Sequence, residues 1–239
     1  MALLEISGLT RNFGGLRAVS NLSFTVAAGE ILGLIGPNGS GKTTIFNLIT
    51  GFLSPTMGDI RLDNENIVGL KPYAVTRRGI TRTFQIVKPF PHLTVRENAA
   101  LAALVRLGDR AKADAEAVRA LKQVGLADKL DIPASDLTLG DQKRMEIARA
   151  LATGPKLLLL DEPLGGLNPR EMEDACGLIE HIHATGITVI LVEHVMKAIM
   201  RISHRVVVIR QGEKIAEGPP AQVVSDPAVI SAYFGKRVA

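Results

Sequence analysis

The chain has 239 residues, of which 46% are hydrophobic and 22% charged, so it is long enough to bury a substantial core and has the composition of an ordinary folded protein. Its net charge of +4 is modest, and with no Trp, two Tyr and seven Phe it is poorly supplied for stacking bases, so we expect no nucleic-acid partner. A single cysteine excludes an internal disulfide and is typical of a reducing compartment, and no segment reads as a membrane span or a secretory signal.

The first 63 residues predict β-strands around one helix. Residues 3–9 and 18–26 read as short strands separated by the turn signal Gly14-Gly15, and residues 59–63 read as another strand. Between them, the run 30–35, apolar after its first residue, predicts a buried strand, and residues 44–49 predict the opening of a helix.

The middle of the chain has a different pattern. From position 89 to about 130, apolar residues recur at helical spacing, over residues 95–107 and 111–124, with Gly125 and Pro133 as punctuation. Alternation then resumes, with strands at 156–160, 187–192 and 205–209 and helices starting at Pro169 and Val195.

Such alternation predicts a parallel sheet flanked by helices, that is, an α/β fold interrupted by a helical insertion. We expect a single domain over 1–239. Its α/β core with a β subdomain would comprise residues 1–85 and 154–239, and its helical subdomain residues 86–153.

Residues 36–43 read GPNGSGKT and fit the phosphate-binding pattern GxxxxGK[ST] between a predicted strand and a predicted helix. In that context, consecutive backbone N–H groups and the helix N-terminus point at one anion. Lys42 would reach the β- and γ-phosphates, and the Thr43 hydroxyl would bind Mg²⁺. A chance glycine-rich turn is the alternative. The candidate nucleotide-binding residues are Gly36, Pro37, Asn38, Gly39, Ser40, Gly41, Lys42, Thr43 and Thr44.

Two carboxylates, Asp161 and Glu162, follow four leucines at the end of a predicted buried strand. In open α/β sheets the carboxyl ends of strands form the ligand site. Asp161 would hold the Mg²⁺ shell, and Glu162 would orient and polarise the attacking water. The alternative is an acidic strand end that caps the next turn. Together with the glycine loop, this pair predicts hydrolysis of a nucleoside triphosphate.

A third motif, LTLGDQKRMEIARAL at 137–151, resembles the signature segment of the nucleotide-binding subunits of ATP-binding cassette (ABC) transporters. The resemblance covers essentially the whole chain. It implies a P-loop NTPase (RecA-like) core with an N-terminal antiparallel β subdomain and an inserted helical signature subdomain. It also implies ATP and Mg²⁺ as ligands. By position it matches Gln85 to the Q-loop glutamine, which would bind the metal and sense the γ-phosphate. It further matches Phe13 to an adenine-stacking aromatic, Asn168 to the D-loop, and His194 to the switch histidine at the γ-phosphate.

For Phe13 a place in the core is the alternative. The resemblance implies that the signature residues Thr138, Leu139, Gly140 and Asp141 face the nucleotide of a second subunit, identical or paralogous. A free helix N-terminus suits that role because its N–H groups and dipole attract phosphate oxygens.

The signature departs from the family pattern at two positions. Leu139 replaces a glycine, and a side chain there narrows the allowed backbone angles. Asp141 replaces a glutamine and would repel phosphate if it pointed there. Our hypothesis is that Asp141 faces the ribose or the start of its own helix, where a carboxylate is favourable.

The chain is similar to the ATPase subunits of branched-chain amino-acid importers in several stretches, among them Thr83-Phe84-Gln85 and residues 193–197 and 211–219. The ATPase subunits of urea and amide importers share much of the same sequence. The resemblance implies permease partners, indirect contact with a periplasmic solute-binding protein, and a peripheral place on the cytoplasmic face of the inner membrane. We expect residues 86–93 to receive the permease, unless they fold into the insertion's own core. Alternative functions are a lipid or lipopolysaccharide exporter ATPase, and a non-transport ATPase acting on ribosomes or DNA.

Overall fold

The computed structural model describes residues 2–85 and 88–234. The chain forms two compact units: one runs to Pro72 and resumes at Thr188, and the other comprises Tyr73–Ile187. Within the described ranges, every helix is too short or too polar to cross a bilayer. The predicted division into a core and a subdomain at residues 86–153 remains a prediction.

The first unit contains an antiparallel sheet in the order β2-β1-β4-β5. Its strands are β1 (Ala2–Phe13), β2 (Leu16–Ala27), β4 (Met57–Leu62) and β5 (Glu65–Asn66). β1 and β2 are longer than predicted, because pairing continues through register shifts up to the Phe13–Leu16 pair. Gly14, with φ 56°, then makes the tight turn where the sequence predicted one.

The same unit holds strands in the order β10-β9-β3-β8, in which β3 (Ile31–Ile35) runs parallel to both β8 (Thr188–Val192) and β9 (Arg205–Arg210). β3 and β8 are buried along their whole length, as expected for strands of a parallel sheet. The remaining elements of the unit are α1 (Lys42–Ile49), α7 (Met196–Ile202), the antiparallel β10 (Glu213–Gly218), α8 (Pro220–Val224) and α9 (Pro227–Phe234).

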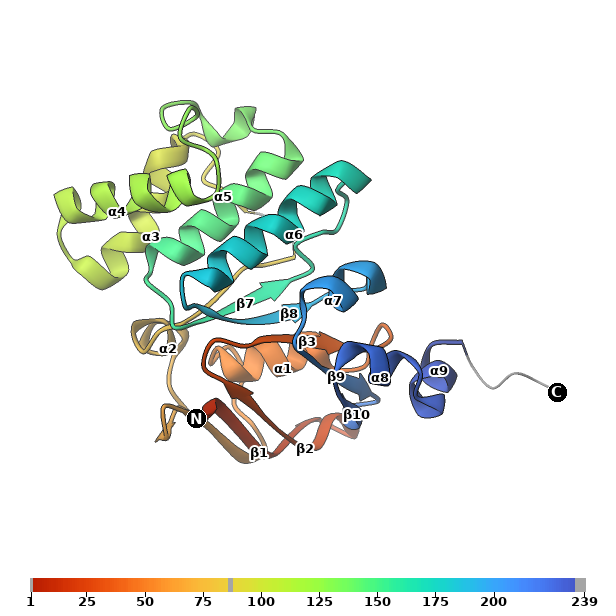
Figure 1. Ribbon diagram of the computed structural model, residues 1–239. Coiled ribbons are helices and arrows are strands. Elements are labelled where there is room, and N and C mark those ends of the chain that lie inside the picture. The colour runs from red at the N-terminus through yellow and green to blue at the C-terminus, as the bar shows by residue number, and fades with distance from the viewer. Residues whose placement is uncertain (1, 86–87, 235–239) are drawn as a thin grey trace. The chain divides into compact units, whose positions relative to one another are not determined.

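The second unit pairs two parallel strands, β6 (Ile80–Arg82) and β7 (Leu157–Asp161). Three of its helices pack on one another through buried alanines and leucines, namely α3 (Val95–Leu107), α4 (Arg110–Gln123) and α5 (Leu139–Ala152) (Figure 1). The unit also contains α2 (Pro72–Arg77), the 3₁₀ turn η1 (Ala134–Asp136) and α6 (Pro169–Ala184).

The α/β class, the antiparallel β subdomain and the helical region are confirmed. The helix starts follow local chemistry. Thr94 caps α3 and Asn168 caps α6, each in a reciprocal box with a glutamate three residues later. The elements that the sequence analysis missed are short: α2, β5, β6, β10, α8 and α9. Short elements present too few residues for a period to emerge.

Candidate nucleotide site

The glycine loop joins β3 to α1 within the first unit, as predicted. A Cβ on Gly36 would collide with the carbonyl oxygen of Ile209, and one on Gly41 would lie 2.6 Å from the carbonyl oxygen of Ala18. Gly41 has φ 108° and caps α1 without a side-chain hydrogen bond, so the helix start keeps its amide groups for a ligand. The packing around the loop therefore requires glycine at both positions, as the phosphate-binding pattern does.

The Lys42 ammonium is buried and folded back over the loop. Its Nζ donates to the carbonyl oxygens of Gly36 at 2.6 Å and Pro37 at 3.0 Å. The Gly212 amide donates to the Ser40 carbonyl at 2.9 Å, which ties the loop to the turn after β9. A cation and a row of amides on a rigid loop are the elements of a triphosphate site.

Phe13 and His194 also belong to the first unit, and both are exposed. Phe13 is 42% exposed at the end of β1 with the Arg11 guanidinium 4.7 Å above its ring, so the predicted alternative of a core position is excluded. His194 follows β8. Its backbone amide donates at 3.0 Å to the carboxylate of Glu193, which is buried.

In the second unit, Asp161 ends β7 and its carboxylate is buried against Arg82. Nη2 of Arg82 lies 2.6 Å from Oδ2 of Asp161, and the two side chains are only 6% and 4% exposed. The backbone amide of Asp161 also donates to Oγ1 of Thr83 at 3.3 Å. The end of β6 thus holds both the side chain and the backbone of the predicted metal-binding carboxylate.

We expect Arg82→Met to lower the free energy of unfolding by about 3 kcal/mol, because it leaves Asp161 as a buried charge without its counter-ion. Denaturant titration against Arg82→Lys, which keeps the charge, measures the difference. A loss below about 1 kcal/mol for Arg82→Met would show that the pair contributes like an exposed one.

Glu162, the next residue, has an unusual backbone. Its φ of 49° lies in the left-handed region, which a residue with a side chain seldom adopts. Its carbonyl oxygen accepts hydrogen bonds from Nζ of Lys143 at 3.1 Å and from the Gly165 amide at 3.2 Å. Its carboxylate accepts a hydrogen bond from Nε2 of Gln85 at 2.6 Å. The structure therefore brings together the predicted base and the predicted Q-loop glutamine.

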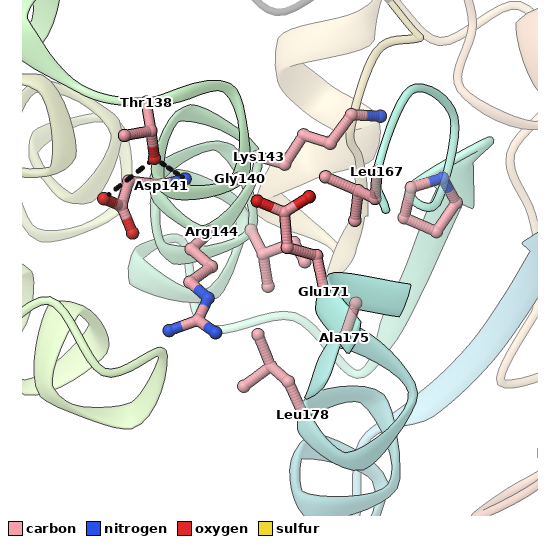
Figure 2. Close-up of a pocket in the computed structure, with 11 residues that line it drawn as sticks. Thr138, Gly140, Asp141, Lys143, Arg144, Leu167, Glu171, Ala175 and Leu178 are labelled. Carbon is pink, nitrogen blue, oxygen red and sulfur yellow. Dashed lines mark hydrogen bonds between the residues drawn. The ribbon is translucent and has the colours of Figure 1, made fainter. Parts of the chain in front are cut away.

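The signature segment begins α5, with Thr138 as the N-cap. Leu139 and Gly140 both have negative φ, so the leucine in place of glycine causes no backbone strain. Leu139 is 48% exposed. A pocket of about 120 Å³ lies between α5 and α6, and Figure 2 shows the Glu171 carboxylate directed toward the start of α5 beside Gly140.

Asp141 turns back to its own helix start. The Thr138 hydroxyl donates to Oδ2 of Asp141 at 3.0 Å and accepts from the Asp141 amide at 3.3 Å (Figure 2). Nζ of Lys129 donates to the same Oδ2 at 2.5 Å. Partial burial raises the pKa of the Asp141 carboxyl, but the bonds from Lys129 and Thr138 and the charges of Lys129 and Arg144 outweigh it, so the pKa is lowered. The hypothesis that Asp141 faces its own helix start agrees with these contacts.

The D-loop asparagine, Asn168, is exposed and caps α6. Its Oδ1 accepts hydrogen bonds from the backbone amides of Arg170 and Glu171, both at 3.0 Å. The backbone amide of Asn168 donates to the Glu171 carboxylate at 2.8 Å. These contacts fix the end of the side chain at the start of α6.

The signature helix also braces the chain on both sides of Gln85. Glu146 accepts a hydrogen bond from the Phe84 backbone, and burial raises the pKa of its carboxyl. Nη1 of Arg149 donates to Glu146 at 2.8 Å and to the carbonyl oxygen of Lys88 at 3.2 Å. Residues 86 and 87 of the predicted docking segment lie outside the described residues.

In the rest of that segment, Pro89 and Leu93 are half-buried and the other four residues are exposed. Phe90 is 50% exposed, so it does not fold into the core as the alternative required. The buried Asn98 holds its backbone: the Phe90 amide donates to Oδ1 at 2.9 Å, and Nδ2 donates to the Phe90 carbonyl at 3.1 Å.

The predicted site residues therefore fall in two groups. The glycine loop, Phe13 and His194 belong to the first unit, and Gln85, Asp161, Glu162, the signature and Asn168 to the second. Sequence reasoning missed the residues that hold these groups in place, chiefly Arg82, Asn98, Lys129, Lys143, Glu146 and Arg149. A basic residue two or three positions before Gln85 was the available signal for Arg82.

The chain matches known families over most of its length. The model of the ABC transporter family matches residues 19–165, and a model described as branched-chain amino acid ATP-binding cassette transporter matches residues 213–239. The chain is 42% identical, over 98% of both chains, to the high-affinity branched-chain amino acid transport ATP-binding proteins BraF of Pseudomonas aeruginosa and LivG of Escherichia coli K12.

The predicted alternative is also represented among the relatives. The lipopolysaccharide export system ATP-binding protein LptB of Escherichia coli K12 is 35% identical over 99% of this chain and 98% of its own. Among solved structures, a nucleotide-free ATP-binding cassette from an ABC transporter superposes with a TM-score of 0.90 at 31% identity, over 99% of this chain and 100% of that one.

The higher identity to the branched-chain amino acid relatives, together with the carboxyl-terminal match, favours an importer ATPase over a lipopolysaccharide exporter ATPase. The chain has a phosphate loop, an aspartate followed by a glutamate at the end of β7, and a signature helix. It shares its fold with the solved nucleotide-free cassette, to which it is 31% identical. The chain belongs to the ATP-binding proteins of ABC transporters, in the branched-chain amino acid importer family, and it is the ATPase subunit of such a transporter, coupling ATP hydrolysis to transport.

Proposed function

We propose that this ATPase works as a pair of subunits that close around two ATP molecules, each bound by the glycine loop of one subunit and the signature of the other. The second subunit is an identical copy or a close paralogue. Support comes from a related cassette, 27% identical with a TM-score of 0.81, which was solved as a dimer bound to ADP and phosphate. The signature helix of this chain carries no lysine or arginine in its first turn, so it relies on backbone amides to receive a phosphate.

Glu162 is the proposed general base, and the observation that carries this role is its contact with Gln85. A carboxylate that accepts a short hydrogen bond from an amide is held in one orientation, as a base for an attacking water must be. Lys42 binds the β- and γ-phosphates, His194 donates to the γ-phosphate, and Phe13 stacks on adenine.

Mg²⁺ is proposed to be held by Thr43, Gln85 and Asp161. A hydroxyl, an amide oxygen and a carboxylate are the hard oxygen donors that this ion prefers. Asp161 uses Oδ2 for Arg82 and Gln85 uses Nε2 for Glu162, which leaves one oxygen of each for a metal shell. When bound, the ion would neutralise charge on the phosphates.

The permease is proposed to dock on the second unit, on the segment 88–93 and the adjoining surface of α3. A groove of about 880 Å³ runs along α3 and α4 from Leu93, and Leu101 and Leu104 are exposed in it. Exposed leucines in an open groove, beside a segment whose backbone Asn98 holds at Phe90, suit a segment of a permease subunit.

Phe90→Asp is expected to weaken association with the permease subunits roughly 30-fold, because a charge replaces an exposed aromatic anchor. Co-purification from membranes, with ATP binding measured in parallel, tests this. Met57→Asp is the matched control, since Met57 is 59% exposed on β4 in the other unit. Equal recovery of permease with both variants would contradict the proposed docking surface.

The transported solute is proposed to be a branched-chain amino acid or a related small polar solute. The subunit would lie peripherally on the cytoplasmic face of the inner membrane, with a periplasmic binding protein as an indirect partner. Identification of the membrane subunits that co-purify tests this directly. Permeases of an amino-acid importer are the expected result, and lipopolysaccharide export subunits would contradict it.

A further inference from the structure

Two carboxylates lie at the tip of the signature helix, where the proposed function puts a phosphate. Asp141 lies in the first turn of α5. The Glu171 carboxylate of α6 lies close by, with Oε1 3.4 Å from where a Cβ on Gly140 would stand (Figure 2). Two carboxylates at the place where the proposed function puts a triphosphate would repel it.

Lys129 offsets one of these charges. It follows α4 in the loop that leads to η1, and its Nζ lies 2.5 Å from Oδ2 of Asp141. The Asp141 side chain is 16% exposed and that of Lys129 35% exposed, so the pair is partly shielded from water. The hydrogen bond that Lys129 donates to Asp141 raises the pKa of the Lys129 ammonium, which is therefore charged at neutral pH.

The same carboxylate oxygen also receives the Thr138 hydroxyl. Two donors thus converge on Oδ2, an ammonium and a hydroxyl, and the Thr138 oxygen in turn accepts a hydrogen bond from the Asp141 amide in the first turn of the helix. The Asp141 carboxylate is therefore held against the N-cap of its own helix, beside the ammonium of Lys129.

We propose that Lys129 is a positioning residue of the signature, which neutralises Asp141 and fixes its carboxylate so that the tip of α5 can receive the triphosphate of a second subunit. This inference rests on the proposed function, since it requires that the signature meets a nucleotide in trans. The alternative is that Lys129 only ties the loop 125–133 to α5. Its loss would then affect folding, and the charge at the tip of α5 would have no effect on dimer formation.

The test uses ATP-driven dimer formation in a Glu162→Gln background, followed by analytical ultracentrifugation across an ATP titration. Lys129→Met is expected to raise the ATP concentration for half-maximal dimerisation roughly ten-fold, because one unit of negative charge becomes uncompensated near the phosphates. Lys122→Met is the matched control, an exposed lysine at the end of α4.

If Lys129 acts through its charge, removing the charge of Asp141 as well should restore dimer formation. If Lys129 is only a structural tie, it should not. The double variant Lys129→Met with Asp141→Asn has lost the ion pair and carries no net charge there, and it is expected to dimerise within about two-fold of the parent. The defect of Lys129→Met alone should also deepen at low salt, where screening is weakest.

The inference would be overturned if Lys129→Met dimerised like the Lys122→Met control. It would also be overturned if the double variant were as impaired as Lys129→Met. A third contradicting result is a dimerisation defect that follows a fall in thermal stability which Asp141→Asn does not repair. Failure of the proposed function is distinguishable, because the Glu162→Gln parent itself would then remain monomeric at saturating ATP.

Discussion

Glu162→Gln is expected to lower ATP turnover at least about 100-fold, to leave ATP binding in place and to accumulate a closed dimer. A general base contributes about two to four orders of magnitude, and glutamine cannot accept the proton from water. Glutamine nevertheless preserves the shape of the side chain and an oxygen that can accept the bond from Gln85. Steady-state hydrolysis and equilibrium binding of a fluorescent ATP analogue separate the two effects.

The matched control is Glu180→Gln, which removes a carboxylate from α6 near the end of that helix. It should hydrolyse ATP as the parent does. Full activity of the Glu162→Gln variant would remove Glu162 from the role of base, whatever its contact with Gln85.

Lys42→Ala is expected to weaken ATP binding itself by roughly 100-fold, since it deletes a cation that would contact two phosphates in a water-poor site. In the described loop the ammonium is buried and donates to the Gly36 and Pro37 carbonyls, so its loss also removes the group that bridges the loop. Isothermal titration with a slowly hydrolysed ATP analogue measures the affinity.

Lys71→Ala serves as the control because Lys71 is exposed and lies in the same unit. A Lys42→Ala variant that binds as tightly as the Lys71→Ala control would contradict the phosphate-binding role of the loop lysine. Unchanged affinity together with lost turnover would limit Lys42 to the chemical step.

The parts that sequence analysis predicts well depend on short stretches of chain. The glycine loop is predicted from eight consecutive residues and lies between a strand and a helix as expected, and its neighbours leave no room for a side chain at Gly36 or Gly41. The four leucines of β7 likewise favour a buried strand, which the structure shows with Asp161 at its end.

The parts that it misses depend on residues far apart in the chain. Arg82 and Asp161 are 79 positions apart and meet because β6 and β7 pair in parallel. That pairing cannot be derived from either segment alone. Similarly, the sequence shows that Asp141 departs from the family pattern, but Lys129 belongs to another segment, and only the packing of α4 on α5 brings the loop after α4 to it.

Strand lengths were missed for a different reason. β1 continues from Leu9 to Phe13 through irregular register, and bulges interrupt the alternation that marks a strand. Because β1 extends this far, Phe13 lies at the end of a strand, exposed and beneath Arg11. A shorter strand followed by a loop would not hold Phe13 in this position.

The claim on which this account depends is that one subunit's signature helix completes the ATP site of another. The direct measurement is a structure of the Glu162→Gln enzyme with ATP and Mg²⁺ bound. We predict that backbone amides at Gly140 of one subunit lie within hydrogen-bonding distance of the γ-phosphate held by Lys42 of the other. An ATP-loaded enzyme in which Gly140 is remote from every γ-phosphate would contradict it.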